Sequence, residues 1–343
     1  MNQQAHGFVY VQTNAEEMNE VVVYRRHADG RLERLGSYLT GGTGSGKPHL
    51  PSQSSVVLSD GKLFVANAGS GDVTVFAIDE EALILADRAS SRGSAPTSIA
   101  VHDEHVYVLN TGGQPNVAGF RLDAQGRLVA LPGSTQSLGV GSDPAQVAFS
   151  LDGRTLLVTD RAADAIHAFA VDADGVAGAP VANPSSGATP YGFDFTPDGA
   201  VIVTEAAGAQ VGKATASSYR LNGDGELVPV SGAVPSTRSE VCWAVVSKDG
   251  RTVFVTNFGD GTISTYAIGE DGSIELREAV AATTIEGEPG LRDEALSADG
   301  RYLYALHADA REVFAWEVGD GGTLTALGSA NGLPATAAGL AAS

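Results

Sequence analysis

Several polar side chains that are able to do chemistry stand where a strand-like apolar run begins or ends. Glu205 closes one such run and is the best candidate for a general base, because a partly desolvated carboxyl group can have its pKa raised toward the working pH. The alternative for Glu205 is a hydrogen-bonded residue of a central cavity with no catalytic role. Gln146 and Tyr191 begin neighbouring runs, and we expect them in the catalytic site as donors to a developing oxyanion. Gln53 begins another run and is a candidate for the same task and for binding the substrate.

The residues that end the second run of each unit form a polar set of their own. Oxygen-bearing side chains suit Ca²⁺, but short polar residues also satisfy backbone groups where a strand leaves a sheet. No dedicated calcium-binding loop accompanies the set, so we predict no bound metal, and we predict no cofactor either. His307, a member of the set, is expected to contact a substrate. The set consists of Thr13, Asn67, Asn110, Asp160, Glu205, Asn257 and His307.

Arginines beside these positions are candidates for holding an acidic substrate. Arg161 and Arg292, and similarly Arg238, carry a planar fork of N–H donors that matches a carboxylate bidentately. The alternative is that the arginines pair with acidic neighbours in the chain, and the formal charge of −20 favours that interpretation. The acidic neighbours are Asp160, Glu240, Asp293 and Glu294.

Cys242 and Trp243 begin a further apolar run. A nucleophilic cysteine needs a histidine or another cation nearby, and none adjoins Cys242 in the sequence, so a buried structural thiol is favoured. Trp243 is a candidate wall against which a planar substrate stacks; alternatively, it plugs a central channel.

Composition and motifs exclude several classes of protein. The 343 residues include 41 acidic and 21 basic ones, and this excess of negative charge repels a phosphate backbone, so we expect no nucleic-acid partner. A single cysteine excludes an intrachain disulfide framework. No apolar run of about 18 residues marks a membrane span. Residues 41–47 imitate a phosphate-binding loop, but Pro48 replaces the Ser or Thr that would reach Mg²⁺, and no helix pattern follows.

The N-terminal residues lack the pattern of a secretory leader. A strand-like run begins at Phe8, with no basic stretch and no apolar segment before it. A cytoplasmic protein is therefore expected, while secretion stays open if a leader has been removed.

A repeated phrase of roughly 45–50 residues runs through the chain. Each unit has an apolar strand, a turn that is most often Asp-Gly, a β-branched strand ending in a polar residue, and two further strands around a second turn. This second turn is Asp-Gly at Asp174, Asp224, Asp271 and Asp320. Asp-Gly between apolar runs favours a hairpin, because glycine accepts positive φ without steric cost. Four antiparallel strands per unit predict an all-β fold, the β-propeller.

Six units are complete and a seventh is split between the two ends of the chain. The N-terminus starts with a second strand over residues 8–13, and the missing first strand is predicted over residues 333–341. Docking that segment into the first blade closes the ring and removes an exposed strand edge. The sequence therefore predicts a single domain over residues 1–343, a seven-bladed propeller closed by its C-terminal strand.

The topology also predicts which face carries a site. First strands begin and second strands end on the same face, and the long connections 41–53, 134–143 and 233–240 open onto it. The connection after Glu205 is long as well, and residues 206–217 could fold over the channel mouth as a lid. Since function concentrates on loops held by a rigid scaffold, we place the site on this face.

The chain resembles the seven-bladed lactonase propeller family, which includes bacterial 6-phosphogluconolactonase and fungal carboxymuconate cyclase. The resemblance covers almost the whole chain and implies the propeller fold. In the cyclase the proposed active groups are a histidine, arginines and a glutamate of the central cavity, and Glu205 stands at the place of that glutamate. The chain departs from the family at two inner-strand starts, where Gln146 and Tyr191 stand in place of the expected histidine and arginine. The phrases that carry the resemblance are 52–54, 67–70, 190–193, 242–243, 256–264 and 339–341.

Two functions follow as hypotheses. The first is an enzyme that hydrolyses a small, acidic cyclic ester or forms it by lactonising isomerisation, with Glu205 as the base and Arg161 or Arg292 on the substrate carboxylate. In this hypothesis the partner is a small molecule, and the oligomeric state stays open. The second is a non-catalytic propeller that binds a small ligand or a protein, since one fold hosts many functions.

Overall fold

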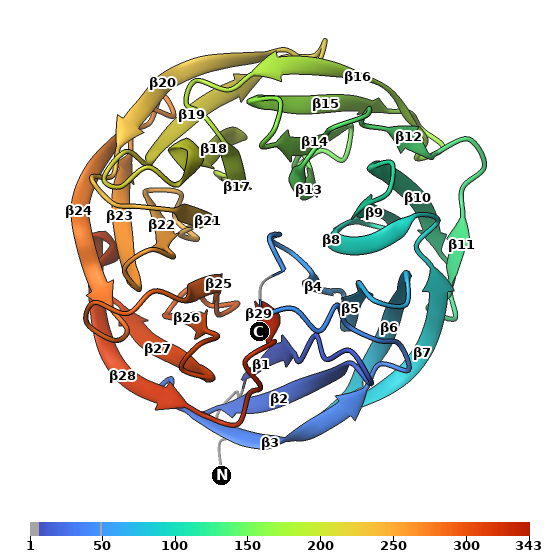
Figure 1. The fold of residues 1–343 in the computed structure, drawn as a ribbon, viewed down its shortest axis with the longest axis horizontal. Coiled ribbons are helices and arrows are strands. Elements are labelled where there is room, and N and C mark those ends of the chain that lie inside the picture. Colours follow the sequence, from blue (N-terminus) through green and yellow to red (C-terminus); the bar gives the residue numbers. More distant parts are fainter. Residues whose placement is uncertain (1–6, 49) are drawn as a thin grey trace.

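Alternating apolar and polar residues, punctuated by tight turns, build a ring of seven antiparallel sheets around a central axis (Figure 1). The computed structural model describes residues 7–48 and 50–343. Blade 1 consists of β29 (Ala338–Ala342), β1 (Gly7–Gln12), β2 (Glu20–Arg26) and β3 (Leu32–Leu39). Blade 2 consists of β4 (Val56–Ser59), β5 (Lys62–Asn67), β6 (Asp72–Asp79) and β7 (Ala82–Ser90).

The next blades continue around the ring in sequence order. Blade 3 consists of β8 (Ser94–His102), β9 (His105–Gly112), β10 (Asn116–Leu122), β11 (Leu128–Ala130) and the short β12 (Gln136–Ser137), which also pairs with β10. Blade 4 consists of β13 (Pro144–Phe149), β14 (Thr155–Asp160), β15 (Ala165–Val171) and β16 (Ala177–Pro184). Blade 5 consists of β17 (Pro190–Phe195), β18 (Ala200–Glu205), the 3₁₀ turn η1 (Ala207–Ala209), β19 (Thr215–Leu221) and β20 (Leu227–Pro235).

The last two blades complete the ring. Blade 6 consists of β21 (Val241–Val246), β22 (Thr252–Asn257), β23 (Thr262–Ile268) and β24 (Ile274–Thr283). Blade 7 consists of β25 (Leu291–Leu296), β26 (Tyr302–His307), β27 (Glu312–Val318), the 3₁₀ turn η2 (Asp320–Gly322) and β28 (Leu324–Ala330). No helix in the described part of the chain has the length and apolarity needed to cross a membrane.

The predicted Asp-Gly turns are confirmed where they join the third and fourth strands. Gly175, Gly225 and Gly272 have φ of +82°, +80° and +86°, a backbone region that residues with a Cβ rarely adopt. These turns place the third and fourth strands of blades 4, 5 and 6 in antiparallel register.

The hydrophobic core is divided into layers between neighbouring blades. One cluster joins blades 4 and 5 through Leu157, Phe193 and Tyr219, and another joins blades 5 and 6 through Ile202 and Tyr266. Because each blade buries both faces against its neighbours, the stability of the ring depends on its closure.

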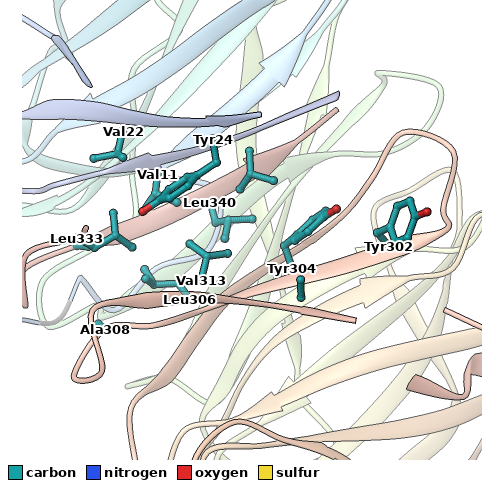
Figure 2. Packing of buried hydrophobic residues seen from close by; sticks show 13 residues of the cluster. Val11, Val22, Tyr24, Tyr302, Tyr304, Leu306, Ala308, Val313, Leu333 and Leu340 are labelled. Carbon is teal, nitrogen blue, oxygen red and sulfur yellow. The ribbon is translucent and has the colours of Figure 1, made fainter. Parts of the chain in front are cut away.

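The closure between blades 7 and 1 is confirmed. β29 pairs antiparallel with β1, with Tyr10 opposite Ala341, and Leu333 and Leu340 pack with Tyr24 and Leu306 (Figure 2). The predicted strand over residues 333–341 is too long at its start, however: β29 begins only at Ala338. The reason is a turn, in which the Ala337 amide donates to the Pro334 carbonyl.

Candidate active site

A cavity of about 540 Å³ opens on the predicted face, at the junction of blades 4, 5 and 6. Its wall comes from residues that precede or begin inner strands or that follow second strands, as the topology predicted. Residues with chemistry in this wall are Asp143, Arg161, Thr189, Tyr191, Glu240 and Cys242, with Phe258 as an aromatic side. The volume lies in the range of ordinary small-molecule sites.

Shifts in strand register at the starts of the inner strands change the direction of side chains near the cavity. The register of β17 against β18 shifts between Pro190 and Phe193, and the same shift occurs after Val241 in β21 and after Leu291 in β25. A shift of this kind frees residues from regular pairing and re-aims their side chains. Tyr191, Cys242 and Arg292 therefore occupy equivalent positions in three successive blades.

Arg161 and Tyr191, both predicted site residues, meet in the cavity wall. Nη1 of Arg161 donates to the Tyr191 hydroxyl at 2.8 Å, and its guanidinium carbon lies 4.8 Å from the centre of the Tyr191 ring. Nη2 of Arg161 also pairs with Asp143 at 2.5 Å. Burial raises the pKa of Tyr191, so its hydroxyl is protonated at neutral pH.

Arg292 is a buried guanidinium with unused donors. Its side chain is 5% exposed and lies over the ring of Phe258, a cavity residue, at 5.5 Å. Nη2 lies 3.7 Å from Asp309, while Nε and Nη1 have no hydrogen-bond partner among the described residues. Burial lowers the pKa of Arg292, although Asp309 and Asp293 oppose that effect. A buried guanidinium with two unused N–H donors is suited to an anionic ligand.

Two further wall residues have opposite characters. Burial, reinforced by Glu240 and Asp293, raises the pKa of the Cys242 thiol to about 12, and its sulfur donates to the Glu240 carbonyl at 3.4 Å. The prediction of a buried, unactivated thiol is confirmed. The Glu240 carboxylate is half-buried in the wall and makes no hydrogen bond or ion pair within residues 7–48 and 50–343.

The long connection after β18 frames the mouth. Ala206, Gly208 and Ala209 line the cavity, and the Gly208 amide donates to the Thr189 hydroxyl at 3.0 Å. The start of this loop therefore lines the cavity, while the folding of residues 206–217 over the channel mouth as a lid stays a prediction.

Glu205 lies outside this wall. It is completely buried, and Oε1 accepts hydrogen bonds from Ser217 at 2.6 Å and from the Gly187 amide at 2.9 Å, while Oε2 accepts one from Thr215 at 2.5 Å. Its neighbour Thr204 faces the opposite way and donates to the Cys242 carbonyl at 2.7 Å. Glu205 thus ties the connection between blades 4 and 5 to β19, and its role as a base stays a prediction.

The two predicted glutamines act as braces between inner strands. Gln146 donates to the Phe193 carbonyl at 2.9 Å and accepts from the Phe193 amide at 2.7 Å, which links blade 4 to blade 5. Gln53 brackets Ala244 of blade 6 in the same manner, at 3.0 and 3.2 Å. The segment ahead of β4 reaches into the middle of the ring (Figure 1).

Trp243 and His307 are buried and do not line the cavity. The Trp243 ring packs 4.9 Å from that of Tyr191, between ring centres, so it supports a wall residue. His307 accepts a hydrogen bond from the Ala310 amide at 3.2 Å, and burial lowers its pKa.

The polar set at the second-strand ends is held by hydrogen bonds within the blades. Asn67 donates to Asp72 at 2.7 Å, and Asn257 donates to Ser264 at 2.9 Å. Burial alone would raise the pKa of Asp160, but hydrogen bonds from His167 and the Asp143 amide lower it to about 2. Over residues 7–48 and 50–343, no cluster of three or more His, Cys, Asp or Glu side chains is arranged to hold a metal ion.

The expected partners of the arginines are wrong. Arg161 pairs with Asp143, Arg238 with Asp260, and Arg292 with Asp309. Asp260 and Asp309 lie in the hairpins that follow second strands, and Asp143 lies just before an inner strand. Sequence neighbours such as Glu294 belong to strands whose alternation directs them elsewhere.

Sequence reasoning missed Glu240 and Thr189 as wall residues. Both immediately precede an inner strand and both have positive φ, of 53° and 61°. Their place in the sequence, directly before an inner strand, could have predicted that they line the cavity.

Comparisons with known proteins agree with this architecture. The family profile described as "Lactonase, 7-bladed beta-propeller" matches residues 3–139, 129–211 and 203–295. A periplasmic gluconolactonase from Pseudomonas aeruginosa superposes with a TM-score of 0.78 at 20% identity, over 98% of this chain and 99% of that one. A protein from Lactobacillus plantarum gives 0.78 at 16% identity, over 99% of each chain. A protein from Bacteroides fragilis, provisionally assigned as a 6-phosphogluconolactonase, gives 0.74 at 17% identity, over 100% and 99%. No curated protein matches by sequence.

Proposed function

Because the chain belongs to the lactonase family of seven-bladed β-propellers, we propose that it hydrolyses a small lactone that carries a carboxylate, in the cavity between blades 4, 5 and 6. The observation that carries this proposal is Arg292, a buried guanidinium with two unpaired N–H donors behind an otherwise largely apolar wall. The unused Nε and Nη1 donors and the positive charge suit a substrate carboxylate better than a neutral ligand.

In the proposed reaction Glu240 is the general base. Its carboxylate takes a proton from a water molecule while the water oxygen attacks the lactone carbonyl carbon. The Tyr191 hydroxyl, polarised by the donor from Arg161, stabilises the oxyanion that forms. The ring C–O bond then breaks, and the proton passes from Glu240 to the leaving alkoxide, which yields the hydroxy acid. We propose hydrolysis rather than lactonising isomerisation because the matched family is one of lactonases.

Glu205 remains the alternative base, as the resemblance to the cyclase implied. Five hydrogen-bond donors satisfy its carboxyl oxygens, and it would have to leave that network to reach a water molecule in the cavity.

A lactone panel followed by pH-stat titration tests the proposal. The panel pairs lactones that carry a carboxylate with their methyl esters at pH 7. We expect turnover that favours the acidic members, with Tyr191→Phe lowering kcat about tenfold through the lost oxyanion donor. Glu270→Gln, the same substitution at an exposed residue outside the cavity, is the matched control, and its kcat and KM should equal those of the wild type. Absence of turnover on every member, with saturable binding only, would instead establish a non-catalytic propeller.

A further inference from the structure

The cavity between blades 4, 5 and 6 is larger than the proposed hydrolysis requires. Its volume of about 540 Å³ lies in the range of sites that hold drug-sized ligands. A five-membered lactone ring with one carboxylate would occupy only part of it. The remaining wall therefore selects the part of the substrate that does not react.

That remaining wall is apolar, and each of the three blades contributes to it. Ala162 lies in the hairpin after β14, Ala206 and Ala209 follow β18, Val241 begins β21, and Phe258 follows β22. Ala206 and Val241 are buried, whereas Ala162 and Ala209 are exposed at the mouth. Covering such a surface with an apolar group removes it from water and favours binding.

Several polar groups of the wall already have partners in the chain. The Arg161 guanidinium donates to the Tyr191 hydroxyl at 2.8 Å and to the Asp143 carboxylate at 2.5 Å. The Thr189 hydroxyl accepts a hydrogen bond from the Gly208 amide at 3.0 Å. A polyhydroxylated substrate would therefore give up its bonds to water and find few new ones in this cavity.

Charge also disfavours a phosphorylated substrate. Among the described residues that line the cavity, Arg161 alone is basic, while Asp143 and Glu240 are both acidic. A phosphate group with two negative charges would approach these carboxylates and be repelled. The single carboxylate of the proposed substrate is assigned to Arg292, which lies over the Phe258 ring at 5.5 Å.

We infer that the substrate carries an apolar side chain of several carbons, which lies along Ala162 and Ala209 while its carboxylate lies near Phe258 and Arg292. Ala162 and Ala209 belong to blades 4 and 5, whereas Phe258 and Arg292 belong to blades 6 and 7, so the two ends of the substrate point in opposite directions around the ring. The inference rests on the proposed hydrolysis for its reaction, but the apolar subsite can be tested without turnover.

The kinetic test uses 5-alkyl-2-oxotetrahydrofuran-4-carboxylates with methyl, propyl and pentyl chains, followed by pH-stat titration at pH 7. We expect kcat/KM to rise at least about tenfold from methyl to pentyl, since each buried methylene contributes about three- to fourfold. 6-Phosphoglucono-δ-lactone should give a kcat/KM at least about tenfold below that of the pentyl member.

The binding test uses 2-alkylcyclopentane-1-carboxylates, which have no ester bond to hydrolyse. They are titrated into the full chain with labelled Val methyl groups. We expect saturable shifts at Val241 and a Kd that falls from methyl to pentyl as kcat/KM rises. No shift is expected at Val245, which lines a second, acidic cavity of about 260 Å³ farther along the inner strands.

Two neighbouring alanines give a matched pair of variants. Ala162→Gln places an amide in the apolar wall and should lower the pentyl-to-methyl ratio of kcat/KM at least about threefold, the contribution of one methylene. Ala163→Gln changes the next residue of the same hairpin, which is also exposed but lies outside the cavity, and should keep the ratio.

The outcomes separate the inference from the proposed function. Turnover with equal kcat/KM across the series would overturn the inference and leave the hydrolysis standing. Chain-length-dependent binding at Val241 without turnover would support the apolar subsite and refute the hydrolysis. A preference for 6-phosphoglucono-δ-lactone, or an unchanged ratio in Ala162→Gln, would also overturn the inference.

Discussion

The two cavities of the ring share the inner strands β17 and β21 and differ in the charges that surround them. At the candidate active-site face, Arg161 and Arg292 accompany Tyr191 and Phe258, and two carboxylates stand in the wall. Farther along the strands, Asp194, Asp293 and Glu294 gather with one exposed lysine. The position along the strand, rather than the net charge of −20, therefore decides which charges surround each cavity.

The closing strand distinguishes the two cavities most strongly, because Leu340, Ala341 and Ala342 line only the acidic one. Deleting residues 333–343 removes β29 and exposes the edge of β1. We expect a fall in melting temperature of about 10 °C or more, or aggregation, as measured by scanning calorimetry and light scattering. An unchanged melting temperature would show that ring closure does not depend on this strand.

The acidic cavity should make stability depend on pH. Glu294 has a folded pKa above its unfolded value, so its contribution is fully present in acid and is lost as pH rises through the folded pKa. Glu294→Gln imitates the neutral form. It should match the wild type near pH 4.5 and exceed its unfolding free energy by about 1–3 kcal/mol at pH 8.

Urea unfolding at both pH values measures this difference. Because His307 titrates in both proteins, its opposite contribution cancels in the comparison. A variant less stable than the wild type at pH 8 would show that Glu294 is ionised and well paired.

The cavity between blades 4, 5 and 6 should lose its preference for carboxylate-bearing lactones when Arg292 is replaced. We expect Arg292→Met to lower kcat/KM for carboxylate-bearing lactones about 30-fold and to leave their methyl esters within about threefold, since only the acids use the guanidinium. Steady-state kinetics on matched acid and ester pairs measure this effect. An equal loss on both substrates would indicate a structural role for Arg292.

Cys242 should have the smallest effect, although it lies in the same wall. Its pKa of about 12 leaves the thiol protonated and a poor nucleophile at neutral pH. We therefore expect Cys242→Ala to keep kcat within about twofold, and trapping with iodoacetamide to be slow. A loss of all activity, with the fold intact by circular dichroism, would contradict this expectation.

The repeats predicted the architecture more completely than the site. Seven blades, the split blade and the face on which the larger cavity opens follow from turn residues and strand periods. The direction of each side chain depends on register, which bulges alter. Tyr191 reaches the cavity because the register of β17 shifts around it, whereas Glu205 faces away because Thr204, its neighbour, already faces blade 6.

The side-chain partners were equally hard to predict. Gln53 and Gln146 look like catalytic amides in the sequence, but each brackets a backbone peptide of another blade. Such partners lie 191 and 47 residues away in the chain, and only the closed ring brings them together.

The most direct test of the account compares Glu240→Gln with Glu205→Gln on one carboxylate-bearing lactone. If Glu240 is the general base in the cavity between blades 4, 5 and 6, Glu240→Gln should lower kcat at least about 100-fold with an unchanged melting temperature. Glu205→Gln should keep kcat and melt lower, because an amide cannot accept all the hydrogen bonds that hold this carboxylate. The reverse result, with kcat lost only in Glu205→Gln, would contradict the account and make Glu205 the base.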